Sequence, residues 1–224
     1  MSTTHKDRGA EPALKRIVND PVSRRKFIGL TGGTIGAGAL LAACGEDDET
    51  TTEAETTTTE EEMASQFGEG DLGIVNYALT LEYLEADFYD KVANSGLFDG
   101  DNLDLIKTFG ANEEAHVEAL LQTAKSLGDP APKPETDFPL ESADEVLQLA
   151  ATVENLGAAA YLGQAAAIES EDILAAALSI HTIEGRHAAA LNKMLGESIT
   201  PDGAFAEPAT MEEVLDAVQP FIVS

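Results

Sequence analysis

One pattern of metal-ligating residue types occurs twice in the chain: a Glu, a Tyr seven residues later, and a Glu-x-x-His pair further along. The two copies consist of Glu82, Tyr89, Glu113 and His116, and of Glu154, Tyr161, Glu184 and His187. All of these residues lie in segments that are otherwise rich in Leu, Ile, Ala and Val. Carboxylates and imidazoles directed into an apolar interior are costly unless a positive charge lies between them. The doubled pattern therefore predicts a buried site for two metal ions.

Each Glu-x-x-His pair can direct both of its side chains to one point, because residues three apart lie on the same side of a helix. Two such pairs, together with one Glu from each of two further helices, would supply four carboxylates and two imidazoles. This ligand set favours iron or manganese over a structural zinc site, which more often uses thiolates. The ligand set therefore leaves two iron ions or two manganese ions open as the cofactor.

The repeated spacing is the main argument for a metal site, because a single Glu-x-x-His pair is a weak signal in a chain with 41 acidic residues. Glu113 follows Glu82 by 31 residues, and Glu184 follows Glu154 by 30. The alternative interpretation is a solvated acidic surface with two ordinary histidines. That interpretation leaves the matched spacing unexplained.

Two neighbouring residues could also belong to the site. Glu85 lies on the same helix face as Glu82 and could replace it or add a ligand. Its counterpart in the second copy is Gly157, and for this reason we favour Glu82. His181 lies one turn before Glu184, and we expect it to support the site or to lie at the surface rather than to bind metal.

The two tyrosines of the pattern are the candidate catalytic residues. Tyr89 and Tyr161 each follow the first Glu of their copy by two helical turns, about 10 Å along the axis. Helical side chains lean toward the N-terminus, so each phenol can reach back toward the metal layer. We expect each hydroxyl to donate a hydrogen bond to a ligand carboxylate of the other copy, and the phenols could also pass an electron. The tyrosines without counterparts are expected to pack or to lie at the surface: Tyr77 and Tyr83.

Hydrophobic periodicity predicts four helices that must position these residues, at 72–93, 102–127, 143–168 and 171–195. A short amphipathic helix is expected at 211–218, where it would cover one end of the bundle. The expected helix-capping residues are Asp71, Ser142, Ser170, Gly196 and Thr210. No segment alternates convincingly with a period of two, so the domain is predicted to be all-α.

The link between the second and third helices, residues 128–141, contains four prolines. Prolines exclude a helix and favour an extended path of about 3.1 Å per residue, or roughly 40 Å in total. That length matches a helix of about 25 residues. The link can therefore cross the full length of the bundle and bring the third helix parallel to the second.

The pattern resembles that of the ferritin-like di-iron carboxylate proteins, in which two helices each give a Glu and two others each give a Glu-x-x-His pair. The segments 81–86 (LEYLEA) and 184–189 (EGRHAA) look like the branch with exported and desiccation-related members. The resemblance covers about residues 70–195 and implies a ferritin-like antiparallel four-helix bundle with a long crossover between helices two and three. The ligands that it implies are Glu82, Glu113, His116, Glu154, Glu184 and His187.

The resemblance implies a di-iron protein that oxidises Fe(II) or reduces peroxide or dioxygen, with a small oxidant as its partner. A non-catalytic protein that holds metal and protects the envelope under stress or desiccation is the alternative, and a di-manganese catalase-like activity is a third. The chain has no Cys-x-x-Cys pair for the rubredoxin module of rubrerythrin, so we expect no built-in electron relay. Substrate, electron donor and oligomeric state stay open, with a homodimer as one candidate.

Residues 1–44 have the pattern of a signal sequence for export. Arg24 and Arg25 resemble a twin-arginine signal, and the apolar run that ends in Leu-Ala-Ala-Cys at Cys44 resembles a lipoprotein box. We therefore expect export by the twin-arginine route and a lipid on Cys44 that anchors the protein to the outer face of the cytoplasmic membrane. Residues 45–64, mostly Glu, Asp and Thr, are expected to form a disordered tether to a domain at 65–224.

The charge balance excludes two classes of partner. The formal net charge is −28, and only six of the 13 Lys and Arg residues follow Cys44. Nucleic-acid binding needs clustered basic residues, so it is not expected. Electrostatic attachment to an anionic membrane is not expected for the same reason, and any anchoring must come from the lipid.

Overall fold

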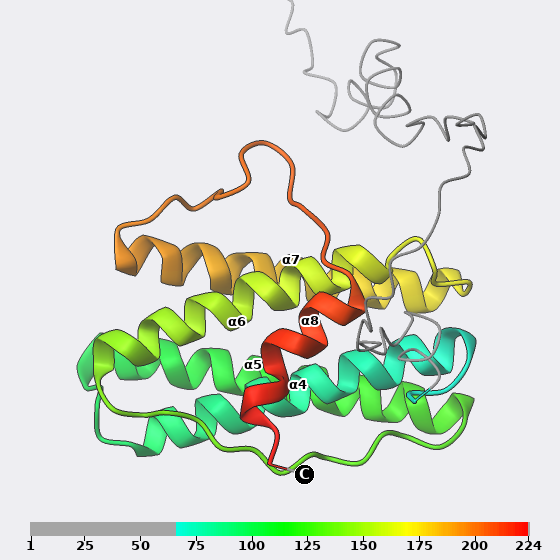
Figure 1. The fold of residues 1–224 in the computed structure, drawn as a ribbon, viewed down its shortest axis with the longest axis horizontal. Coiled ribbons are helices and arrows are strands. Elements are labelled where there is room, and N and C mark those ends of the chain that lie inside the picture. Colours follow the sequence, from blue (N-terminus) through cyan, green and yellow to red (C-terminus); the bar gives the residue numbers. More distant parts are fainter. Residues whose placement is uncertain (1–65, 224) are drawn as a thin grey trace, which may run out of the picture. The chain divides into compact units, whose positions relative to one another are not determined.

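The computed structural model describes residues 66–223, and the predicted leader (1–44) and acidic tether (45–64) lie outside them. Within these residues five α-helices and one short 3-10 helix form the fold (Figure 1). They are α4 (Gly70–Asn94), α5 (Gly100–Leu127), α6 (Ala143–Gln164), α7 (Glu171–Leu195), α8 (Met211–Val218) and η1 (Gln219–Phe221). The only extended pairing between residues 66 and 223 is an isolated bridge between Thr136 and Ile222. The predicted all-α fold is confirmed.

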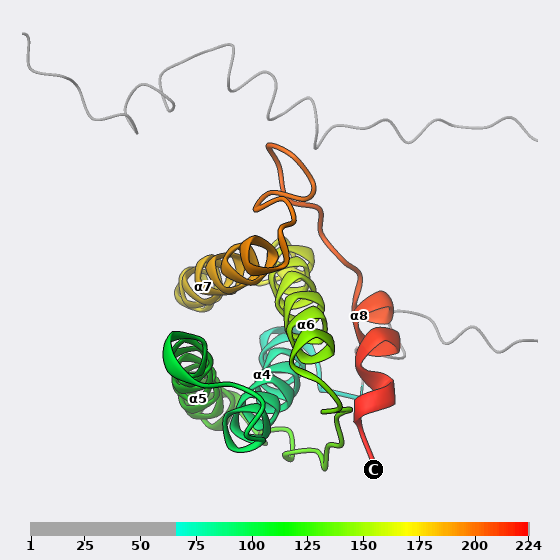
Figure 2. The ribbon, with the colours of Figure 1, turned by 90° about the vertical axis from the view of Figure 1, so that its left-hand side faces the viewer.

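Helices α4 to α7 form a four-helix bundle made of two antiparallel hairpins, α4 with α5 and α6 with α7 (Figures 1 and 2). The link 128–142 runs along the bundle from the end of α5 to the start of α6 (Figure 1). Helix α6 therefore runs parallel to α5, as the four prolines of the link predicted. None of the helices between residues 66 and 223 combines the length and apolar character needed to span a membrane.

Most predicted helix ends are found where the capping residues placed them. The side chains of Ser142, Ser170 and Thr210 each accept a hydrogen bond from the backbone amide three residues later. Gly196 ends α7 with a φ of 78°, a left-handed conformation that glycine adopts without strain. These local signals fix the starts of α6, α7 and α8.

The expected N-cap role of Asp71 is wrong. Helix α4 begins at Gly70, and Asp71 lies inside its first turn. The Asp71 carboxylate instead accepts hydrogen bonds of 2.8 and 2.9 Å from the backbone amides of Glu169 and Ser170. Asp71 therefore connects the start of α4 to the turn between α6 and α7. Helix α6 ends at Gln164 rather than 168, because residues 165–167 form the tight turns that lead into this contact.

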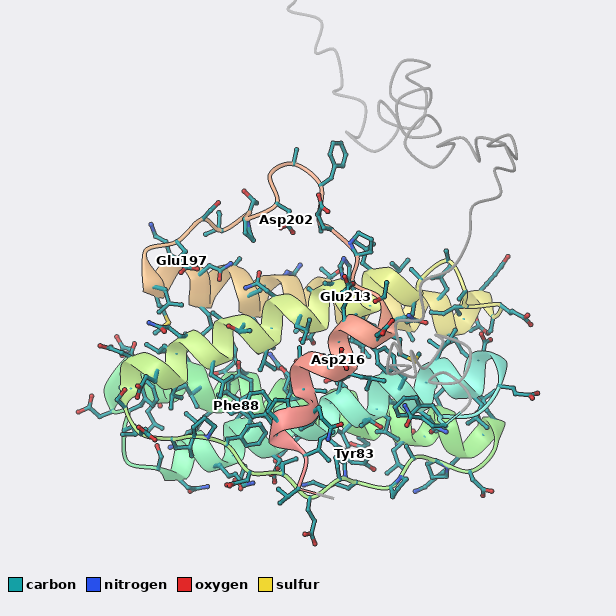
Figure 3. The ribbon with its side chains drawn as sticks, in the orientation of Figure 1. Tyr83, Phe88, Glu197, Asp202, Glu213 and Asp216 are labelled. Atoms are coloured by element: carbon teal, nitrogen blue, oxygen red, sulfur yellow. The ribbon has the colours of Figure 1, made fainter. Side chains whose placement is uncertain are left out.

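Helix α8 lies along the flank of the bundle against α6 rather than over one end, contrary to the expectation (Figures 1 and 2). The backbone amide of Ala209 donates to the carbonyl of Ala159 at 3.1 Å. A Cβ at Gly163 would lie 2.0 Å from the Ala209 carbonyl oxygen, so only glycine allows this approach. The loop between α7 and α8, which carries Glu197 and Asp202 (Figure 3), is long enough to lead the chain back along α6.

Buried apolar side chains form two clusters, and their members flank the predicted ligands on both sides in sequence. On α4, Glu82 lies in sequence between Leu79 of the smaller cluster and Phe88 of the larger one. On α7, the Glu-x-x-His pair lies between Ile180 of the smaller cluster and Leu191 of the larger one. The core is therefore apolar on both sides of one polar layer.

Candidate metal centre

All six predicted ligands meet in this polar layer, and every helix of the bundle contributes. The contributors are Glu82 from α4, Glu113 and His116 from α5, Glu154 from α6, and Glu184 and His187 from α7. Each of the four glutamates is 0% exposed. The layer thus holds four fully buried carboxylates, which is tolerable only if positive charge is also present.

The ligand atoms form two groups, in each of which they lie within 4.8 Å of one another. The first group is Glu82, Glu113, His116 and Glu184, and the second is Glu113, Glu154, Glu184 and His187. Glu113 and Glu184 belong to both groups. Each has two carboxylate oxygens, so these two residues are placed to bridge a pair of ions.

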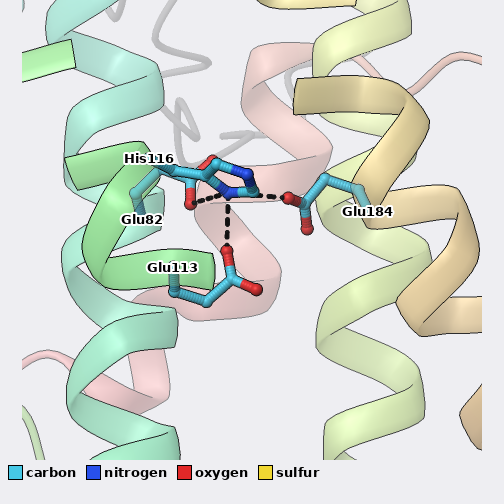
Figure 4. A group of neighbouring side chains, drawn as sticks. All are labelled: Glu82, Glu113, His116 and Glu184. Atoms are coloured by element: carbon cyan, nitrogen blue, oxygen red, sulfur yellow. Dashed lines mark hydrogen bonds and ion pairs between the residues drawn. The ribbon is translucent and has the colours of Figure 1, made fainter. Parts of the chain in front are cut away.

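The first group is arranged around the Nδ1 atom of His116 (Figure 4). This atom lies 2.8 Å from Glu113 Oε2 and 3.2 Å from both Glu82 Oε2 and Glu184 Oε1. Carboxylates from three helices therefore converge on one imidazole nitrogen. Figure 4 shows their oxygens directed toward the same space from opposite sides.

The second group is arranged around His187 in the same way. Its Nδ1 atom lies 2.9 Å from Glu113 Oε1 and 3.2 Å from Glu154 Oε2. The other ring nitrogen, Nε2, lies 3.0 Å from the amide nitrogen of Asn112, and Phe109 stacks on the ring at 4.1 Å between centroids. Asn112 and Phe109 hold the imidazole so that Nδ1 faces the carboxylates.

Several of these buried atoms have no hydrogen-bond partner outside the cluster itself among the described residues: Glu113 Oε1, Glu154 Oε2, both Glu184 oxygens and His187 Nδ1. Buried polar atoms are nearly always paired, so such a cluster needs a physical reason. Adjacent ligands of an octahedral ion with bonds of about 2.1 Å lie about 3 Å apart. The spacing and orientation of these atoms therefore fit a pair of cations.

The imidazoles carry positive charge when no metal neutralises the layer. Burial lowers the pKa of His116, but hydrogen bonds to Glu113, Glu184 and Glu82 outweigh burial and raise the pKa to about 12. Burial also lowers the pKa of His187, and its hydrogen bonds to carboxylates raise the pKa to about 10. Both rings would therefore be protonated near neutral pH.

The carboxylates respond to burial and to one another. Burial raises the pKa of Glu184 to about 8, and the neighbouring charges of Glu113 and Glu154 add to this effect. Burial also raises the pKa of Glu113, but hydrogen bonds from His116 and His187 outweigh it and lower the pKa to about 2. Burial is the main cause that raises the pKa of Glu82 well above its ordinary value. Two imidazolium charges therefore do not balance the four buried ligand carboxylates, and cations would supply the remaining positive charge.

The two tyrosines of the repeated pattern make the expected hydrogen bonds across the two copies. Tyr89 donates to Glu154 Oε1 at 2.5 Å, and Tyr161 donates to Glu82 Oε1 at 2.6 Å. Burial, followed by the charge of the accepting carboxylate, raises the pKa of both phenols well above its ordinary value. Each phenol therefore stays protonated and holds one carboxylate oxygen in place, which leaves the other oxygen free for the cluster.

Glu85 also lies in the polar layer, beside Glu82 rather than instead of it. Its side chain is buried, and burial followed by the charge of Glu184 raises its pKa well above the ordinary value. A Cβ at Gly157 would lie 2.9 Å from Glu85 Oε1 and 3.4 Å from Glu184 Oε2. The Glu85 carboxylate therefore fits only because position 157 carries no side chain. This is the structural reason why one copy of the pattern has Glu85 and the other has Gly157.

Other sequence candidates lie away from the two groups. His181 contacts the backbone carbonyl of Ala158 through Nδ1 at 3.0 Å and joins neither group. Tyr77 is buried in the larger apolar cluster, and Tyr83 is half-buried beside the smaller one. Sequence reasoning missed Asn112 and Phe109, and the only available signal was their position close to the predicted ligand pair on the same helix.

Comparison with known proteins agrees with this arrangement. A family model described as the ferritin-like domain matches residues 70–197, which is more than half of the chain and includes α4 to α7. No curated protein matches the chain in the sequence comparison. The matched family and the buried Glu/His cluster together suggest a metal centre. The chain belongs to the family of ferritin-like domains.

Proposed function

We propose that this protein binds a dinuclear iron centre and uses it to oxidise Fe(II) or to reduce peroxide or dioxygen. The observation that carries the proposal is the pair of ligand groups that share Glu113 and Glu184. A shared pair of carboxylates is what two closely spaced ions require, whereas a single structural ion needs only one group. Two manganese ions would fit the same donors.

The chain's own residues have distinct roles in this proposal. Glu113 and Glu184 would be shared by the two ions, Glu82 and Glu154 would each hold one ion, and the two histidines would complete the set. Four carboxylates nearly neutralise two divalent cations, so the bound pair lowers the cost of burying the glutamates. When bound, the metal pair supplies the electrons for reduction of a small oxidant.

Tyr89 and Tyr161 support the centre from outside the ligand set. Their hydroxyl groups orient Glu154 and Glu82, and their rings belong to the apolar clusters on either side of the polar layer. The rings exclude water from the carboxylates that they hold. Because each phenol lies one hydrogen bond from a ligand, it is also placed to pass an electron.

The experiment is an anaerobic titration of the metal-free protein with Fe(II), followed by exposure to air. We expect two ions per chain and then the absorption band of an oxo-bridged di-ferric product. Glu113→Gln should lose both ions because Glu113 belongs to both groups, whereas Glu114→Gln, the exposed neighbour, should behave as wild type. Absence of saturable Fe(II) binding would contradict the proposal.

The same titration separates catalysis from metal holding. A protein that holds metal in envelope stress protection would bind two ions but would not consume oxidant over repeated additions of Fe(II) or peroxide. Metal analysis of the protein as purified from its native cells distinguishes iron from manganese, and a manganese result would favour a catalase-like reaction.

We also propose that the protein is exported by the twin-arginine route and anchored by a lipid on Cys44. Arg24, Arg25 and the Leu-Ala-Ala-Cys sequence support this proposal. Mass spectrometry of the mature chain should find an acylated N-terminal Cys44. Cys44→Ser should release the protein from the membrane fraction, and an unmodified Cys44 in membrane-bound protein would contradict the proposal.

A further inference from the structure

Helices α4 and α7 begin, and α5 and α6 end, at the same end of the bundle (Figure 1). The residues at this end enclose a cavity. This end cavity has a volume of about 350 Å³ and is lined by residues from all four helices. Several of its lining residues are exposed, among them Leu127, near the end of α5, and Asp172, in the first turn of α7. The end cavity is therefore separate from the ligand layer but belongs to the same bundle.

The walls of the end cavity are mostly apolar. Ile74, Leu81, Leu120, Ala160, Ile173 and Ala177 give it aliphatic surface from each helix. The exposed Asp172 is the only Asp, Glu, Lys, Arg or His among the lining residues. An anion would meet no cation there and would lie close to the acidic ligand layer, so the cavity favours a neutral molecule.

One polar group of the wall has no partner. Tyr77 is 1% exposed and lines the end cavity, and its hydroxyl has no hydrogen-bond partner among the described residues. The other tyrosine of the wall, Tyr161, already donates its hydroxyl to Glu82. Because burying a hydroxyl without a hydrogen-bond partner is unfavourable, the Tyr77 hydroxyl is the group for a ligand oxygen to meet.

We propose that the end cavity binds a neutral apolar molecule that carries one carbonyl oxygen, which accepts a hydrogen bond from Tyr77. An engineered cavity of about 150 Å³ holds benzene, so by proportion the end cavity accommodates roughly 10–15 non-hydrogen atoms. Tyr161 forms part of the wall and holds Glu82, so the bound molecule lies one side chain away from the ligand layer. Binding itself requires no metal.

Three naphthalenes of similar size test the proposal: 2-acetylnaphthalene, 2-ethylnaphthalene and naphthalene-2-carboxylate. Equilibrium dialysis is performed on the full-length chain with Cys44→Ser, so that no attached lipid can compete. Metal-free and metal-loaded samples are both measured, which keeps this test separate from the metal proposal. We expect one saturable site for the ketone and binding of the carboxylate that is at least about tenfold weaker.

Variants locate the site. Ala177→Leu fills the end cavity and should weaken the ketone and the hydrocarbon about tenfold or more, whereas Ala175→Leu, exposed on the same helix and outside the cavity, should leave both within twofold. Tyr77→Phe keeps the ring and should weaken only the ketone, by about threefold to tenfold, as expected for one hydrogen bond. Lack of saturable ketone binding, or unchanged binding in Ala177→Leu of native helix content, would overturn the proposal. Equal losses of ketone and hydrocarbon in Tyr77→Phe would overturn the role of Tyr77.

Discussion

Gly157 of α6 faces Glu85 of α4 so closely that a Cβ at position 157 would lie 2.9 Å from Glu85 Oε1. The two copies of the repeated pattern differ at this point, since the residue three after Glu82 is Glu and the residue three after Glu154 is Gly. The glycine therefore makes room for a fifth buried carboxylate beside the six predicted ligands. Because Gly157 lies on α6 and Glu85 on α4, the missing side chain in one hairpin lets a carboxylate of the other hairpin fit into the polar layer.

Gly157→Ala should displace the Glu85 carboxylate and weaken metal binding about tenfold. Alanine is a better helix former than glycine by up to about 1 kcal/mol, and this gain should offset the strain at position 157. The free energy of unfolding of the metal-free variant should therefore fall by no more than about 1 kcal/mol. The measurement is an Fe(II) binding isotherm together with a denaturant titration. Gly185→Ala is the matched control, because a Cβ there meets nothing within 4 Å. Unchanged Fe(II) affinity in Gly157→Ala would show that metal binding does not depend on the space left by the missing side chain at position 157.

Tyr161→Phe should weaken Fe(II) binding about tenfold to a hundredfold, because it removes the donor that orients Glu82. Tyr89→Phe should do the same through Glu154. Tyr83→Phe, a half-buried tyrosine outside the ligand groups, serves as the control and should bind Fe(II) as wild type does. If all three variants bind equally well, the phenols have no supporting role.

The metal-free protein should become less stable as the pH rises from about 5 to 8. Burial raises the pKa of Glu184 to about 8, and the neighbouring carboxylates raise the pKa of His187 to about 10. At a pH between the ordinary and the raised pKa of each group, the folded state therefore holds more protons than the unfolded state. The stabilisation is present below the ordinary pKa values and is lost as the pH rises through the raised ones. We expect a loss of at least about 2 kcal/mol in urea titrations.

Metal-loaded protein should not show this loss over the same pH range, because cations replace the protons as the source of positive charge. Binding of metal near pH 7 should release protons from His116 and His187. Calorimetry in buffers of different ionisation enthalpy measures this release. A metal-free protein whose stability rises between pH 5 and 8 would contradict the assigned charge balance.

Gly163→Ala should destabilise the protein by about 2 kcal/mol or more. A Cβ at 163 would lie 2.0 Å from the backbone carbonyl oxygen of Ala209, and backbone cannot rotate away as a side chain can. Helix α8 would have to move off α6 and expose Val214, which is 0% exposed. Urea denaturation measures the loss, and Gly185→Ala again provides the control. A stability equal to wild type would show that α8 docking does not depend on Gly163.

The helices could be predicted because short-range sequence signals mark them, and the ligands because their spacing recurs along the chain. Ser142, Ser170 and Thr210 mark helix starts because the side chain of each accepts a hydrogen bond from the backbone amide only three residues later. The ligands could be found because the pattern occurs twice, and the crossover because prolines limit its conformations.

The remaining features depend on contacts between distant segments. Asp71 bonds to backbone amides near residue 170, and Gly157 makes room for Glu85 on another helix. The position of α8 depends on the fit of Ala209 against Gly163. None of these contacts follows from helix periodicity, because each requires the relative height and rotation of packed helices.

The most direct test of the metal centre is anomalous diffraction from crystals soaked anaerobically with Fe(II) and measured at the iron edge. The account predicts two peaks about 3.5–4 Å apart, one in each ligand group, with Glu113 and Glu184 contacting both. A single peak, or peaks outside the layer formed by Glu82, Glu113, His116, Glu154, Glu184 and His187, would contradict it.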